Sequence, residues 1–178
     1  MTDREKAFAI EGCVRLSARM MHLRLSECEQ MASLYAQHAG IPVELVWAAR
    51  DESEVFGKIV TLALRRPVIG RWLARRALKK AENRAAISMS AREKAIEIDA
   101  SGRIVELWMK KSPSYVGAMM ARKAWIVGLE PEFVARVSEE TEIFMRELEA
   151  ATKVEKQDTD LTAIRPRTRL KRPEKRHL

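Results

Sequence analysis

Apolar residues recur at spacings of three and four along most of the chain. Near the amino-terminal end the series is Ala7, Ile10, Val14, Ser17 and Met21. A second series is Val134, Val137, Thr141, Phe144 and Leu148. This spacing places one apolar stripe along an α-helix. Both segments are therefore expected to pack in a helical bundle.

Helix-capping motifs divide the chain into further segments. Thr2-Asp3-Arg4-Glu5, Ser26-Glu27-Cys28-Glu29 and Ser90-Ala91-Arg92-Glu93 have the capping-box pattern, and Asp51-Glu52-Ser53-Glu54 is a weaker version. Ser112-Pro113 and Pro131 suit first turns, whereas Gly40 and Gly128 suit helix ends. Helices are predicted at about 3–21, 27–39, 43–50, 52–65, 68–87, 91–110, 113–127 and 131–151. The fold class is mainly α, a compact bundle of about seven to eight helices, and no repeat of solenoid period is visible.

The segment 95–108 fits a helix less well than the others. Ile96 and Ile98 alternate with Glu97 and Asp99, and turn-forming residues follow before a second alternation. This pattern also suits a single β-hairpin near 95–108. The capping box at Ser90 favours a helix that is broken near Gly102.

The length of 178 residues corresponds to one domain. A helical globular domain is expected over 1–151, followed by a flexible basic tail over 152–178 that contains Pro166 and Pro173. The chain starts without a signal-peptide pattern, so a cytoplasmic location is expected. Cys13 and Cys28 are then expected to be reduced core residues.

The net charge of +8 is unevenly distributed along the chain. Residues 58–84 carry a net charge of +8 and residues 165–178 carry +6, whereas 1–57 and 85–164 each carry −3. Basic segments beside an acidic body favour a polyanionic partner.

The predicted helix 68–87 concentrates its charge on one side. Projection at 100° per residue gathers small apolar residues on one face and cations on the other. The cationic side carries Arg71, Arg75, Arg76, Lys79 and Lys80, with Arg84 at its border and Trp72 among them. Trp72 is expected either to stack on a base or to pack against a neighbouring helix.

A weak helix-turn-helix pattern covers residues 32–50. Ala36, Gly40, Ile41 and Val46 have the spacing of such units. The positions that a recognition helix would turn toward base edges, however, carry Val43, Glu44, Trp47, Ala48 and Asp51. None of these is the Arg, Lys, Asn or Gln that usually reads the major groove. A packing unit is therefore predicted in preference to a base-reading one.

No catalytic constellation is recognised in the sequence. His22, His38 and His177 are far apart, and no combination with the two cysteines has zinc-ligand spacing. No phosphate-binding loop or nucleophile elbow is visible. The sequence therefore predicts a non-enzymatic protein without a metal or cofactor.

The leading hypothesis is binding of DNA or RNA through its phosphates. The basic helix is expected to supply Arg71, Trp72, Arg75, Arg76, Lys79, Lys80 and Arg84. The tail is expected to supply a flexible arm of Arg165, Arg167, Arg169, Lys171, Arg172, Lys175 and Arg176.

Two alternative functions use other partners. Arg165-Pro166-Arg167-Thr168-Arg169 resembles the arginine-rich C-terminal signals of proteins exported by type IV secretion systems, which implies an exported or protein-binding adaptor. The other alternative is a membrane-surface protein that uses the apolar stretch Val55 to Leu64 together with the basic helix.

Overall fold

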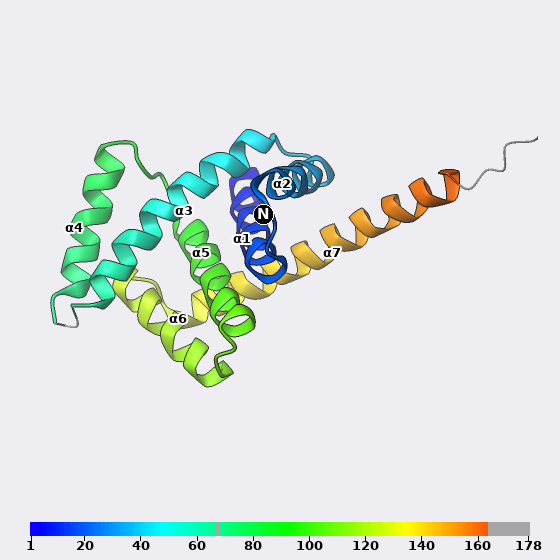
Figure 1. The fold of residues 1–178 in the computed structure, drawn as a ribbon. Helices are drawn as coiled ribbons and strands as arrows, with labels where there is room; N and C mark the ends of the chain where they lie inside the picture. Colours follow the sequence, from blue (N-terminus) through cyan, green and yellow to red (C-terminus); the bar gives the residue numbers. More distant parts are fainter. Residues whose placement is uncertain (67, 164–178) are drawn as a thin grey trace, which may run out of the picture.

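The computed structural model describes residues 1–66 and 68–163, with side chains placed as far as Lys153. This part of the chain forms seven α-helices and one π-helical turn, without strands (Figure 1). The helices are α1 (Asp3–Met21), α2 (Leu25–Ala39), α3 (Val43–Leu64), α4 (Gly70–Asn83), α5 (Ala91–Arg103), α6 (Pro113–Val127) and α7 (Pro131–Ala163), with the turn η1 (Ile104–Trp108) after α5. The mainly α prediction is confirmed.

The β-hairpin expected as an alternative near 95–108 is not formed, because α5 and η1 occupy that segment. Both halves of the capping box at Ser90 are present: its hydroxyl accepts from the Glu93 amide, and Glu93 accepts from the Ser90 amide. The alternation of apolar and acidic residues in this segment does not reflect a strand with one exposed face. Residues 95–100 are all buried because α5 packs against α1, α6 and α7. Here the charged positions do not mark a solvent-facing side.

Helix α3 is continuous where a break was predicted near residues 50–52. Asp51, the capping position of the weaker capping box, lies inside the helix, so it does not cap a new one. Glu52 instead accepts hydrogen bonds from Arg4 and from the Ser88 amide. Helix α7 also runs beyond the predicted end at residue 151, as far as Ala163.

The helix-turn-helix pattern corresponds to α2, the turn at Gly40 and the start of α3. Gly40 has a left-handed φ of 67°, which glycine adopts without a Cβ penalty. Ala36, Ile41 and Val46 are buried together in the main core. Their spacing therefore reflects helix packing.

The structure reveals an internal repeat that the sequence reading missed. Residues 2–64 align without a gap on residues 90–152, and 17 of the 63 aligned positions are identical. Arg-Glu-Lys-Ala, for example, occurs at 4–7 and at 92–95. The first residues of α1, α2 and α3 lie 88 positions before those of α5, α6 and α7. The body is therefore two copies of one three-helix unit.

The contacts between the copies are reciprocal. Arg4 Nε donates to Glu93 at 3.0 Å, and the equivalent Arg92 Nε donates to Glu5 at 2.9 Å. Arg4 also pairs with Glu52 on α3, as Arg92 pairs with Glu140 on α7. Reciprocal contacts are the pattern expected of two units related by a twofold axis.

Helix α4 has no equivalent in the described part of the second copy. It packs on α3 and α6 at one edge of the molecule, whereas α7 continues outward from the body (Figure 1). Ile59 and Ile126 form part of the apolar seat of α4. Their equivalents in the other copy are Glu147 and His38, so no matching apolar seat exists there. Helix α4 is thus an addition to a duplicated core.

Gly70 permits the close approach of α4 to α3. A Cβ atom at this position would lie 2.3 Å from the carbonyl oxygen of Ala63. Gly70→Ala is therefore expected to displace α4 and to lower the free energy of unfolding by about 1–3 kcal/mol. Chemical denaturation measures this change.

Gly117→Ala is the matched control, because a Cβ at that exposed position in α6 would meet no atom within 4 Å. It is expected to stabilise the protein by about 0.5–1 kcal/mol, through the higher helix propensity of alanine. Equal stability changes in the two variants would contradict the tight contact at Gly70.

Candidate nucleic-acid interface

The side of α4 that faces the protein is formed by small or apolar residues at nearly regular spacing. Gly70, Ala74, Leu78 and Ala81 are buried. The opposite side is exposed at every predicted position: Arg71, Trp72, Arg75, Arg76, Lys79, Lys80 and Arg84. We call the six cations of this set, without Trp72, the cationic face. The amphipathic pattern thus predicted correctly which side of this helix meets solvent.

The cationic face has no carboxylate partners within the described residues. The single acidic residue of α4, Glu82, lies 3.4 Å from Lys94 of α5. Several arginines of the body, in contrast, pair with carboxylates: Arg15 with Glu97 and Arg103 with Asp99, for example. The positive charge of α4 is therefore available to a molecule outside the fold.

Aromatic rings lie beside these charges. The indole of Trp72 is 57% exposed, and the guanidinium of Arg76 lies over it at 5.3 Å from the centroid. On α6, the indole of Trp125 is 49% exposed, with the guanidinium of Arg71 at 5.3 Å. Trp125 was not predicted, because only the packing of α4 on α6 brings it to this surface.

The carboxyl end of α3 extends the positive surface. Arg65 and Arg66 are exposed, and Arg122 of α6 donates to the carbonyl oxygen of Leu64 at 3.1 Å. Leu62 and Val68 are also exposed at this turn. The site thus combines cations with an apolar edge.

The apolar stretch Val55 to Leu64 is mostly part of the core. Phe56, Val60 and Ala63 are each 2% exposed, so they face other helices. Within the described residues, none of the helices combines the length and the apolar character needed to cross a membrane.

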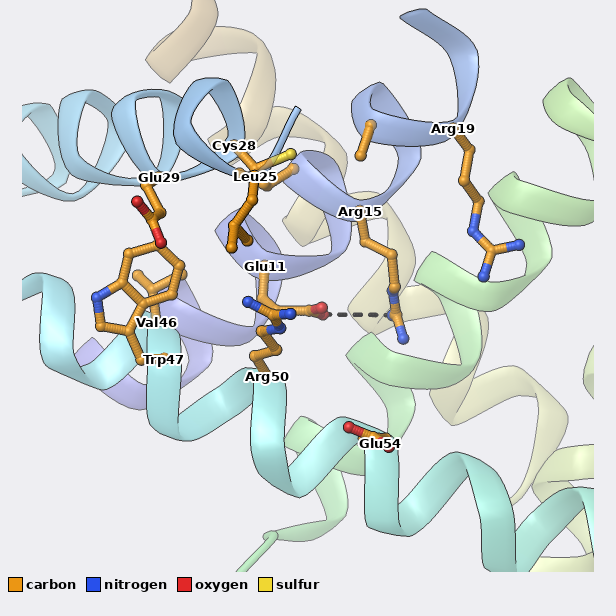
Figure 2. A pocket seen from close by; sticks show the side chains of 12 residues that line it. Glu11, Arg15, Arg19, Leu25, Cys28, Glu29, Val46, Trp47, Arg50 and Glu54 are labelled. Atoms are coloured by element: carbon orange, nitrogen blue, oxygen red, sulfur yellow. Dashed lines mark ion pairs between the residues drawn. The ribbon is translucent and has the colours of Figure 1, made fainter. Parts of the chain in front are cut away.

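A separate cavity of about 360 Å³ lies between α1, α2 and α3 (Figure 2). Glu11 and Arg15 of α1 line it, with Trp47 and Arg50 of α3. Burial raises the pKa of Glu11 to about 7, against the opposing effect of the Arg15 charge. Arg15 is itself held by Glu97, whose oxygens accept from its two terminal nitrogens at 3.0 and 2.7 Å. Glu11, Arg15 and Glu97 thus form a buried ionic network that joins α1 to α5.

Both cysteines are partly buried and pack against the hydrophobic core. Burial raises the pKa of Cys13 to about 11, so its thiol is protonated at neutral pH. Cys28 lines the cavity of Figure 2 and is a free thiol. This arrangement agrees with a packing role for both residues.

The structure brings together every predicted site residue on α4. The following predicted tail residues lie outside the described residues: Arg165, Arg167, Arg169, Lys171, Arg172, Lys175 and Arg176. Comparisons of the chain with protein-family models, with curated proteins and with solved structures give no match.

Proposed function

We propose that this protein binds nucleic acid through the phosphate backbone, using the cationic face of α4 together with the basic tail. The observation that carries the proposal is that five exposed cations on α4, and Arg84 directly after its last residue, lack carboxylate partners within the described residues. Unpaired surface charge of one sign is the feature that attracts a polyanion and releases its counterions.

The residue types favour phosphate. Arg71, Arg75, Arg76 and Arg84 supply guanidinium groups, whose planar donors match phosphate oxygens in pairs. The order of charge along the chain agrees with this function. Each copy of the acidic three-helix unit is followed in sequence by a basic segment, 65–84 after the first and 165–178 after the second.

Two other partners remain as alternatives. The exposed Leu62 and Val68 beside Arg65 and Arg66 form an apolar edge that suits an anionic membrane surface. The resemblance of the tail to type IV export signals suits an adaptor or exported protein. Deleting residues 165–178 separates the latter, because an adaptor would lose delivery or partner capture and keep any binding to nucleic acid.

A salt titration tests the proposal. If about five phosphates are neutralised, the logarithm of the association constant is expected to fall with the logarithm of salt concentration at a slope near −4. Affinity for an oligonucleotide then falls roughly 10²-fold between about 50 and 200 mM salt. Absence of binding to single- and double-stranded DNA and RNA below about 50 mM salt would refute the function. Binding to anionic vesicles alone would favour the membrane surface.

A further inference from the structure

Two exposed indoles lie beside the cationic face, and we call Trp72 and Trp125 the indole pair. Each ring has an arginine of α4 over it, Arg76 over Trp72 and Arg71 over Trp125, and about half of its surface is in water. The same surface therefore offers planar aromatic faces and cations next to one another.

The internal repeat shows that the fold does not require an indole at position 125. Trp125 aligns with Gln37, which is exposed on α2. The two helices start and end at equivalent residues, and both are followed by a left-handed glycine. An equivalent helix thus forms with an amide side chain at the position that Trp125 occupies.

Trp72 is also unnecessary for packing of its helix. Helix α4 is held by Ala74 and Leu78, which lie on its opposite side and are buried. Trp72 itself extends into solvent from the cationic face. Both indoles are therefore features of this surface and not of the core.

We propose that this surface binds single-stranded nucleic acid, with bases stacked on Trp72 and Trp125 and the intervening phosphates held by Arg71 and Arg75. This inference rests on the proposed function and narrows its substrate. Bases of a duplex are already stacked on one another, whereas an unpaired strand can turn its bases onto aromatic side chains. An arginine behind each ring strengthens such a stack through its charge.

The test compares the full-length protein with W72Q/W125Q. Binding to a fluorescent oligothymidylate of about 20 nucleotides and to a duplex of the same length is measured by anisotropy at several salt concentrations. The wild type is expected to prefer the single strand. The double variant is expected to lose at least about 10-fold in affinity for the single strand, with the salt slope and the duplex affinity unchanged.

Trp108→Gln is the matched control. Trp108 is also an exposed indole under a guanidinium, that of Arg19 at 5.1 Å, but it belongs to η1, which packs on α1, α5 and α6. Its replacement is expected to leave both affinities unchanged. The single variant W125Q reproduces the residue of the other repeat, and it provides a second reading if the double variant unfolds.

The outcomes separate this inference from the proposed function. Equal affinity for both oligonucleotides, with no loss in W72Q/W125Q or W125Q, overturns the inference and leaves phosphate binding intact. Absence of binding to either oligonucleotide by the wild type overturns both. A loss in the double variant that appears only with vesicles containing phosphatidylserine also overturns the inference, and assigns the indole pair to a membrane surface.

Discussion

Replacing Glu97 with alanine is expected to lower the free energy of unfolding by about 3–5 kcal/mol, because it leaves a largely buried cation without its main partner. Glu97 is 4% exposed and holds both terminal nitrogens of Arg15. Lys123 also depends on this carboxylate. Burial lowers the pKa of Lys123 and the charge of Glu97 raises it. In the variant, Arg15 and Lys123 therefore both lose the negative charge that offsets their partial burial.

Glu11 can replace Glu97 only in part as the ion-pair partner of Arg15. Its carboxylate lies 3.3 Å from Arg15, and burial raises its pKa to about 7, so it is half protonated near neutrality. The Glu97 charge contributes to that increase. In the variant, Glu11 therefore ionises more readily and stabilises Arg15 as the pH rises. The loss of stability is expected to be larger at pH 5 than at pH 8, which urea denaturation at both values measures.

Glu54→Ala is the control for an ion pair in water. Glu54 pairs with Lys58 one turn along α3, and both side chains are exposed. Its replacement is expected to change the free energy of unfolding far less than that of Glu97, because water screens an exposed ion pair. Similar losses from the two alanine variants would show that the buried network does not stabilise the fold.

Local chemistry predicted the helix starts where side-chain caps are formed. Thr2, Ser90 and Ser112 each accept a hydrogen bond from the first turn, at the predicted places. The prediction failed where tertiary contacts override local pattern. Glu52 binds across to Arg4 of α1, and the buried Glu93 and Glu97 of α5 pair with arginines of α1. Such partners lie tens of residues away in the sequence.

The duplication is visible in the sequence, but its period of 88 residues is longer than the periods of solenoid repeats. The signal consists of few identities, among them Arg4 and Arg92, Gly40 and Gly128, and many conservative pairs without a gap. Helix boundaries at a constant separation make the repeat evident. The repeat is most informative at positions where the two copies differ. Ala9 occupies the place of Glu97, so Arg103 has no equivalent of the bond that holds Arg15, and it pairs with Asp99 instead.

The nucleic-acid interface was also predictable only in part, because one of its residues depends on packing between helices. A helical projection identifies the exposed side of α4, because that depends on residues of one helix. The position of Trp125 depends on how α6 packs against α4, which the periodicity of either helix does not determine. The single-strand proposal therefore needed coordinates, whereas the phosphate proposal did not.

Replacing Arg75, Lys79 and Lys80 together with glutamine is expected to weaken oligonucleotide binding by roughly 10²–10³-fold at 0.1 M salt. All three are exposed cations on α4 without a carboxylate or ring partner within the described residues. Each phosphate contact contributes close to one unit to the salt slope, so the slope is expected to become shallower by about 2.7. Anisotropy titrations over a range of salt concentrations give both quantities from one protein preparation.

The control removes the same charge from elsewhere on the surface. Lys110, Arg136 and Lys153 are exposed and lie outside α4, and their replacement with glutamine also reduces the net charge by three. If binding depended on net charge alone, both triple variants would lose the same affinity and the same slope. A local interface on α4 requires that the control variant stay within a few-fold of the wild type. Since glutamine favours helices almost as well as arginine and lysine, α4 is expected to keep its structure in the test variant.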